Sequence, residues 1–223
     1  MGKYMNRIQI GAHYTRSQHP NIREFRSASG LVNNLLWHMQ PRKLTYENIS
    51  VLGITVSDQG VENSREDPHI YRWLNGVVEC QYHNFDFVAF SDLSVFDRNT
   101  AVLNLVRKSL SAVYTTDSDQ LHTLILMTNK IEESNFNYEA ESKKLSKSNK
   151  ALKLSCILVA RVDHNGQNAF LRVKNDSGEI ISEVHLLTNN INEFRYNLHK
   201  TKWVGSQFHI YQKTGQLFKS FSF

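Results

Sequence analysis

The chain has 223 residues, with 26 Lys and Arg against 21 Asp and Glu, for a formal charge of +5. Three Pro, ten Gly and 40% apolar residues exclude a collagen-like or a wholly disordered chain. Two cysteines are too few for disulfides to stabilise a chain of this length, so a disulfide scaffold is excluded as well. We expect Cys80 and Cys156 to be buried, reduced thiols.

The N-terminus and the apolar runs indicate where the protein is found. No apolar run of signal-peptide length follows Met1, because Arg7, His13 and Arg16 interrupt it. The longest apolar run, residues 156–160, is far shorter than the roughly 20 residues of a membrane helix. We therefore expect a cytoplasmic protein that does not associate with membranes.

The first part of the chain alternates strand and helix patterns. Residues 6–13 and 49–56 alternate or concentrate β-branched residues and are predicted to be strands. Between them, apolar residues at helical spacing predict a helix with Ser29 as N-cap and Pro41 as its stop.

Further along, Asp67-Pro68 predicts a short helix that runs to Leu74 and ends near Gly76, because proline suits the first helical turn. Residues 77–90 are predicted to be a strand, and Asp97 and Asp117 each precede an amphipathic helix that they can cap. Residues 1–133 therefore form a mixed helix and strand lobe.

Residues 134–152 are polar and rich in Lys, Glu, Ser and Asn. They are predicted to be a linker or an exposed helix that separates the first lobe from residues 153–223.

The last lobe has the pattern of an antiparallel sheet. Asn165-Gly166 predicts a two-residue turn that pairs Val162 with Ala169 and Ala160 with Leu171, so that one face is apolar. Residues 175–178 predict a second turn, with Val173 opposite Ile180 and Ala169 opposite Val184. Thr214-Gly215 predicts a third turn, with Phe208 opposite Phe221 and Tyr211 opposite Phe218. Residues 189–199 are predicted to be a helix or loop that crosses between strands.

The sequence thus predicts an α+β protein in which a mixed N-terminal lobe precedes a largely antiparallel β-sheet lobe. The charge divides between them. Residues 1–140 carry 13 Lys and Arg against 15 Asp and Glu, and residues 141–223 carry 13 against 6, so the net charges are −2 and +7.

Basic and aromatic residues interleave in the second lobe. This mixture is typical of single-strand nucleic-acid binders, which pair cations with phosphates and stack aromatics on bases, and also of protein interfaces, where Arg, Tyr and Trp are common anchors. The alternative is that the aromatics pack beneath a solvated sheet face. The candidate binding residues are Arg161, Phe170, Arg172, Arg195, Tyr196, Lys200, Lys202 and Trp203.

No compact catalytic or metal motif is present. The ten His form no His-x-x-x-His pair, and Gly-rich phosphate loops and Cys-x-x-Cys pairs are absent. Asp163-His164 with His185 superficially resembles the metal site of HNH nucleases, but His185 falls in a strand pattern, where that family has a helix. We therefore predict no catalytic residue, no metal ligand and no cofactor.

These observations favour a non-enzymatic binding protein that neutralises or regulates an acidic protein partner, of the toxin-immunity or inhibitor type. The alternative is an RNA- or DNA-binding subunit that uses the same basic lobe. A metal-dependent nuclease using His164 and His185 is a third, weaker hypothesis.

Overall fold

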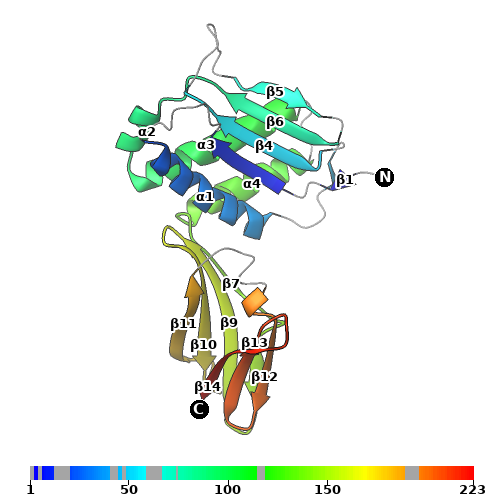
Figure 1. Cartoon of the computed structure of the whole chain (residues 1–223), viewed down its shortest axis with the longest axis vertical. Helices are drawn as coiled ribbons and strands as arrows, with labels where there is room; N and C mark the ends of the chain where they lie inside the picture. Colours follow the sequence, from blue (N-terminus) through cyan, green and yellow to red (C-terminus); the bar gives the residue numbers. More distant parts are fainter. Residues whose placement is uncertain are drawn as a thin grey trace. The chain divides into compact units, whose positions relative to one another are not determined.

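The computed structural model describes residues 3–4, 7–12, 21–40, 45–46, 49–58, 67–73, 75–114, 119–188 and 196–223. The chain divides between Phe136 and Asn137 into two compact parts, the N-terminal unit and the C-terminal unit (Figure 1). The fold is α+β, because helices and strands mix in the first unit and strands dominate the second. Among the described residues no helix is long and apolar enough to cross a membrane.

A four-stranded sheet organises the N-terminal unit. Its order is β2 (Arg7–Ala12), β4 (Val51–Val56), β6 (Val77–Tyr82) and β5 (His69–Arg72); the first three strands are parallel and β5 is antiparallel. A separate two-stranded pair joins β1 (Lys3–Tyr4) to β3 (Thr45–Tyr46). Every second residue of β4 and β6 is buried, as are Ile8 and Ile10 of β2, so one face of the sheet forms the core.

Helices cover that face (Figure 1). They are α1 (Ile22–Met39), α2 (Phe87–Asp92), α3 (Val95–Val113) and α4 (Asp119–Glu133). The Tyr82 hydroxyl, at the end of β6, lies 3.0 Å from Ser109 Oγ and donates to the Leu105 carbonyl of α3. Burial raises the pKa of Tyr82 to about 12, so the phenol stays neutral and keeps its proton for these bonds.

Helix α1 also protects an edge of the sheet. Along the outer edge of β2, no strand of the described residues pairs with its backbone groups. The Asn33 amide of α1 replaces a strand there: its Oδ1 accepts from Ile10 N–H at 2.9 Å, and its Nδ2 donates to Ile10 O at 3.0 Å. One side chain therefore joins the helix to the sheet edge.

Local signals set the helix starts. Asp86 caps α2 by accepting from Ala89 N–H, and Ser94 caps α3 by accepting from Asp97 N–H. At the end of α4, Phe136 has a φ of +57° and is only 1% exposed, while its N–H donates to Ile131 O. This closing turn buries a large aromatic ring before the chain enters the C-terminal unit.

The C-terminal unit contains two antiparallel sheets. The first has the order β11 (Ile180–Thr188), β10 (Gly166–Lys174), β9 (Leu154–Asp163) and β7 (Tyr138–Glu141), and β8 (Lys147–Asn149) also pairs with β9. The second has β12 (Lys200–Val204), β13 (Gln207–Tyr211) and β14 (Leu217–Ser222). Their apolar faces meet in one core cluster, which consists of Cys156, Leu158, Ala169, Leu171, Val173, Leu186, Phe208 and Ile210.

Several predicted elements of the N-terminal unit are wrong in kind or extent. Residues 69–72 are strand β5 rather than a helix, because they pair with β6 through a tight turn in which Gly76 has a φ of +76°. The helix predicted to have Ser29 as its N-cap has Asn21 in that position, eight residues earlier, and Ser29 lies buried within the helix. The strand predicted over 77–90 ends at Tyr82, and its last part is α2. Asp117 lies outside the described residues.

The linker or exposed helix predicted for 134–152 is also wrong. These residues supply β7 and β8, both of which pair with β9. Their polarity reflects strands at one edge of a sheet, where most side chains stay exposed.

The hairpin at Asn165-Gly166 has the predicted faces in a different register. The loop is His164-Asn165, so Ala169 lies opposite Ala160 and Leu171 opposite Leu158. The Asp163 carboxylate accepts a hydrogen bond from Asn165 N–H at 2.7 Å, and this contact moves the turn one residue back. Of the two residues predicted to have a positive φ, Asn165 and Gly166, only Gly166 has one. Because the pairing shifts by two residues, the apolar face is unchanged.

Bulges alter the other two hairpins. In the second, Lys174 lies opposite Ile180 and Leu171 opposite Val184, with irregularities after Ala169 and Val173. In the third, the predicted pairing of Phe208 with Phe221 is confirmed, but Tyr211 pairs with Leu217. Of the predicted crossing at 189–199, residues 189–195 lie outside the described residues.

Replacing Asn33 by alanine should lower the free energy of unfolding by about 2 kcal/mol, because it removes two hydrogen bonds to the β2 edge. Urea denaturation followed by circular dichroism measures the change. The matched control is Asn34→Ala on the same helix, which should cost less than about 1 kcal/mol. Equal losses in both variants would show that the edge contact adds nothing.

Candidate functional site

The predicted binding residues fall on two different sheets of the C-terminal unit. Arg161, Phe170 and Arg172 share the outer face of the first sheet, and Lys200, Lys202 and Trp203 lie on β12 of the second. Tyr196 precedes β12 and is 44% exposed. Arg195 lies outside the described residues. The eight residues therefore do not form one patch.

The two arginines on the first sheet are held in an ion-pair network. Glu139 of β7 accepts from Arg161 Nη2 and from Arg172 Nη1, both at 2.8 Å. Glu183 of β11 completes the network, with Oε2 2.7 Å from Arg172 Nη2 and Oε1 3.1 Å from Arg161 Nη2. The hydrogen bonds from the two guanidinium groups lower the pKa of Glu139 and raise those of both arginines.

This network leaves the outer face of the first sheet close to neutral. Lys174 pairs with Glu141 at 3.0 Å, so each of the three cations on the face has a carboxylate partner. The Arg161 guanidinium also lies 4.3 Å from the centre of the Phe170 ring, whose other neighbour is the His185 ring. A face whose charges are already paired has little to offer a phosphate or an acidic protein.

The remaining positive charge lies elsewhere, where β8 passes beside β12. Three side-chain hydrogen bonds join them: Thr201 Oγ1 to Leu145 O at 2.8 Å, Trp203 Nε1 to Lys147 O at 3.1 Å, and Asn149 Nδ2 to Gly205 O at 3.2 Å. The bonded positions advance by two residues on both segments, from 145 to 149 on one and from 201 to 205 on the other. The two segments therefore run alongside each other. Trp203 is therefore a structural link between them.

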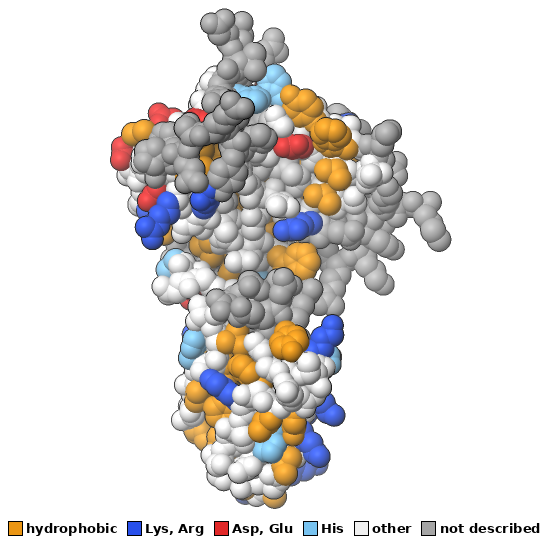
Figure 2. All heavy atoms as spheres, in the orientation of Figure 1, with side chains coloured by type: hydrophobic (Ala, Val, Ile, Leu, Met, Phe, Trp, Pro, Cys, Tyr) orange, Lys and Arg blue, Asp and Glu red, His pale blue; other side chains and the backbone are white. Residues whose placement is uncertain are grey.

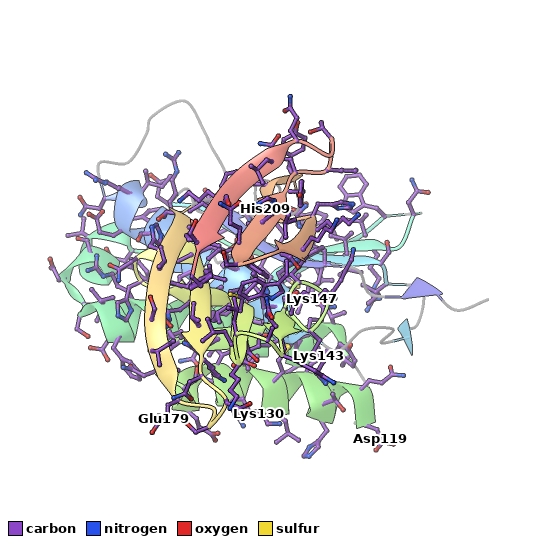
Figure 3. The ribbon with its side chains drawn as sticks, turned by 90° about the horizontal axis from the view of Figure 1, so that it is seen from below. Asp119, Lys130, Lys143, Lys147, Glu179 and His209 are labelled. Carbon is purple, nitrogen blue, oxygen red and sulfur yellow. The ribbon has the colours of Figure 1, made fainter. Side chains whose placement is uncertain are left out.

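The two segments carry five lysines, Lys144, Lys147, Lys150, Lys200 and Lys202, and we call this set the lysine seam. All five are exposed, and none forms an ion pair with a described residue. Figure 2 shows Lys and Arg side chains following the β12 side of the C-terminal unit, and Figure 3 places Lys147 well away from the acidic Glu179. The hydrogen-bonded segments, residues 145–149 and 201–205, extend about 13 Å, the length of four strand residues.

A hollow of about 480 Å³ lies where the seam reaches the start of β12. Backbone bonds shape it: Lys213 N–H donates to Tyr196 O at 2.8 Å, and His199 N–H donates to Tyr211 O at 3.0 Å. Its lining residues are Ser142, Lys144, Leu145, Tyr196, Leu198, His199 and Lys213. The lining contains two cations and no carboxylate, so it favours an anion.

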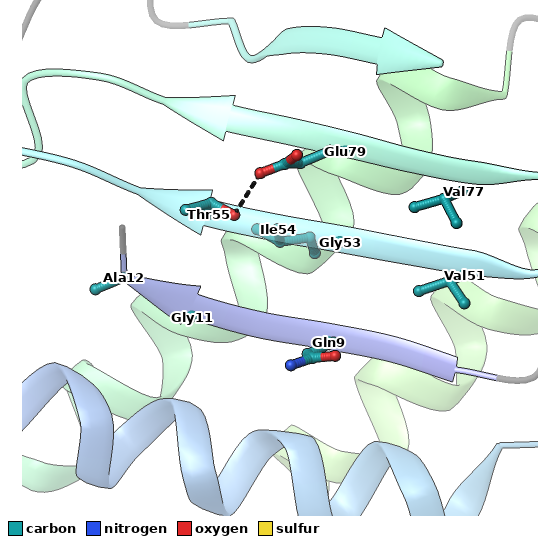
Figure 4. Close-up of a pocket in the computed structure, with 9 residues that line it drawn as sticks. All are labelled: Gln9, Gly11, Ala12, Val51, Gly53, Ile54, Thr55, Val77 and Glu79. Carbon is teal, nitrogen blue, oxygen red and sulfur yellow. Dashed lines mark hydrogen bonds between the residues drawn. The ribbon is translucent and has the colours of Figure 1, made fainter. Parts of the chain in front are cut away.

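A second hollow, of about 550 Å³, lies on the sheet of the N-terminal unit over Gly53 (Figure 4). Its one charged lining residue is Glu79, which accepts from Thr55 Oγ1 at 3.0 Å and from Gln81 Nε2 at 3.1 Å. Because neighbouring residues already use this carboxylate, the hollow is the weaker candidate.

Thiols and histidines offer no reactive centre in the described parts of the chain. Burial raises the pKa of Cys80 to about 11 and that of Cys156 to about 12, so both stay protonated thiols. No three His, Cys, Asp or Glu side chains of the described residues gather as a metal site would require. His185 bonds to Asn168 and Thr188 on the sheet face, whereas His164 lies in the β9–β10 turn.

Comparison with protein-family models, with curated proteins and with solved structures finds nothing that matches this chain. The site therefore rests on its own geometry. Sequence reasoning missed two of its parts: Glu139, because it lies in the segment predicted as a linker, and the hollow, because its residues come from three separate segments. The run of lysines at 143–153 was visible in the sequence.

Replacing Glu139 by glutamine should lower the free energy of unfolding by about 1 kcal/mol at pH 7, a modest value because the pair is partly exposed. The folded-state pKa of Glu139 lies below its ordinary 4.5, so its contribution is present above that pH and is lost as pH falls through the lowered value. The difference between variant and wild type should therefore shrink towards zero in acid.

Chemical denaturation at a series of pH values from 7 down to 3 measures this difference. Glu133→Gln is the matched control, since Glu133 is exposed and forms no ion pair with a described residue. A Glu139 effect that stays constant with pH would contradict a role for its charge.

Proposed function

We propose that the chain is a non-enzymatic binding protein and that its C-terminal unit binds the phosphate backbone of nucleic acid through the lysine seam. One observation carries the proposal: five exposed lysines on two adjacent segments have no acidic partner among the described residues, while both described arginines of the unit are already paired. Lysines that neutralise phosphates release counterions, and this release drives non-specific binding.

The composition of the seam favours nucleic acid over an acidic protein. Protein interfaces are depleted in Lys at their centres and draw most of their binding energy from Trp, Tyr and Arg. Arg161 and Arg172 are engaged in ion pairs, and the Trp203 indole donates to a backbone carbonyl. Lysine, a flexible point charge, suits a phosphate chain that needs no fixed geometry.

The expected binding is weak and strongly dependent on salt. If all five lysines contact phosphates of a single strand, log K should fall against log salt concentration with a slope of about −3.5. Changing Lys147 and Lys202 to glutamine should reduce the slope to about −2. Fluorescence anisotropy of a labelled 20-nucleotide single strand, at salt concentrations from about 50 to 200 mM, measures both values.

Lys108→Gln with Lys130→Gln is the matched control, because it removes the same charge from exposed positions on α3 and α4. The control should keep the wild-type slope. An equal reduction in both double variants would mean that only net charge matters, and no binding at low salt would contradict the proposal.

Neutralisation of a protein partner, of the toxin-immunity or inhibitor type, is a second candidate. It is favoured by apolar side chains that stay 40% or more exposed around the junction of α2 and α3, namely Val88, Leu93, Val95 and Phe96. Exposed apolar groups in one short stretch suit a protein interface better than a phosphate chain.

Affinity capture from native lysate separates the two candidates. A partner that wild type and the seam double variant retain, but that Val95→Asp with Phe96→Ser loses, would support this second function. Circular dichroism must show that the Val95 and Phe96 variant is folded. Capture that does not depend on these two side chains would count against it.

A further inference from the structure

The polar side chains around the C-terminal hollow have no partners among the described residues. The side chains of Ser142, Lys144, Tyr196, His199 and Lys213 form no hydrogen bond or ion pair within that part of the chain. Two other histidines of the unit are engaged. His209 bonds to Tyr211 and Gln207, and His185 bonds to Asn168 and Thr188. Unused donors around one hollow are what a bound ligand requires.

The lining specifies the chemistry of that ligand. Two ammonium groups and two hydroxyls suit phosphate oxygens, whereas Tyr196, Leu145 and Leu198 offer aromatic and aliphatic surface to a planar ring. About 480 Å³ is within the usual range for small-ligand pockets, roughly 300 to 1,000 Å³. The hollow therefore suits a phosphate joined to a ring.

We propose that this hollow binds a phosphorylated nucleotide unit with a terminal phosphate monoester. This inference deepens the proposed function. It rests on that function only for the source of the ligand, which is either the end of a nucleic-acid strand or a free mononucleotide. A monoester carries a charge of about −1.5 to −2 near pH 7, more than the single charge of a backbone diester, so paired lysines discriminate in its favour.

The position of the hollow fits a strand end. Lys144 belongs to both the hollow and the lysine seam, and Lys200 directly follows His199 of the lining. A strand whose terminal phosphate occupies the hollow can therefore continue along the seam, where further lysines meet its backbone.

The experiment compares three single strands of identical sequence that carry a 5′-phosphate, a 3′-phosphate or only hydroxyl ends. The internally labelled strands are measured by anisotropy with the full chain. One phosphorylated strand should bind about tenfold more tightly than the hydroxyl strand, the effect of one charge-assisted contact. Lys213→Gln should abolish that preference, and Tyr196→Leu should weaken it.

Lys143→Gln is the control, since Lys143 is exposed beside the hollow and does not line it. It should keep the preference. Thermal melting of each variant checks that it is folded, which is expected because Lys213 and Tyr196 are exposed.

Calorimetry with adenosine 5′-monophosphate and with inorganic phosphate separates the sources. Equal binding of all three strands, with no mononucleotide binding, overturns the inference and leaves the proposed function standing. Mononucleotide binding that Lys213→Gln removes, without any strand binding, supports the hollow and overturns the proposed function. If inorganic phosphate binds as tightly as the mononucleotide, the proposed contact between the hollow and the nucleotide ring is overturned.

Discussion

The ion-pair network of Arg161 and Arg172 with Glu139 and Glu183 determines how charge is distributed over the C-terminal unit. It connects β7, β9, β10 and β11, so it favours one register across four strands as well as neutralising two arginines. Removing one member would leave an uncompensated charge on a sheet face where Arg172 is only 9% exposed. The positive charge that remains is therefore carried mainly by lysines away from this face.

Side chains also complete the edges of both units. In the N-terminal unit, Asn33 supplies a donor and an acceptor to the edge of β2 that no described strand covers. In the C-terminal unit, Thr201, Trp203 and Asn149 make the corresponding bonds to backbone carbonyls between β8 and β12. These contacts close edges that would otherwise invite pairing with another chain, and in the second case they also bring two groups of lysines together.

Elements that depend on a local residue period or a local turn could be predicted from the sequence. Elements that depend on pairing between distant segments were predicted less well. The faces of β9 and β10 were predicted because a shift of two residues preserves them, although Asp163 changed the register itself. Strand β5 was mistaken for a helix because Asp67-Pro68 suits either structure, and only pairing with β6 decides between them. Likewise, whether Arg161 is available to a ligand depends on Glu139, 22 residues away, in a segment whose polarity hid a strand.

The lysine seam has an electrostatic consequence beyond its count of charges. Lys200 and Lys202 are alternate residues of β12, so their backbones are about 7 Å apart, less than the Debye length of about 8 Å at physiological ionic strength, and their ammonium groups repel one another. No carboxylate of the described residues pairs with them, and the hydrogen bonds between β8 and β12 hold their backbones together. A polyanion along the seam would relieve this repulsion, whereas the network on the neighbouring sheet has no such need. The same unit therefore pairs Arg161, Arg172 and Lys174 with its own carboxylates, whereas the five lysines of the seam pair with none of the described ones.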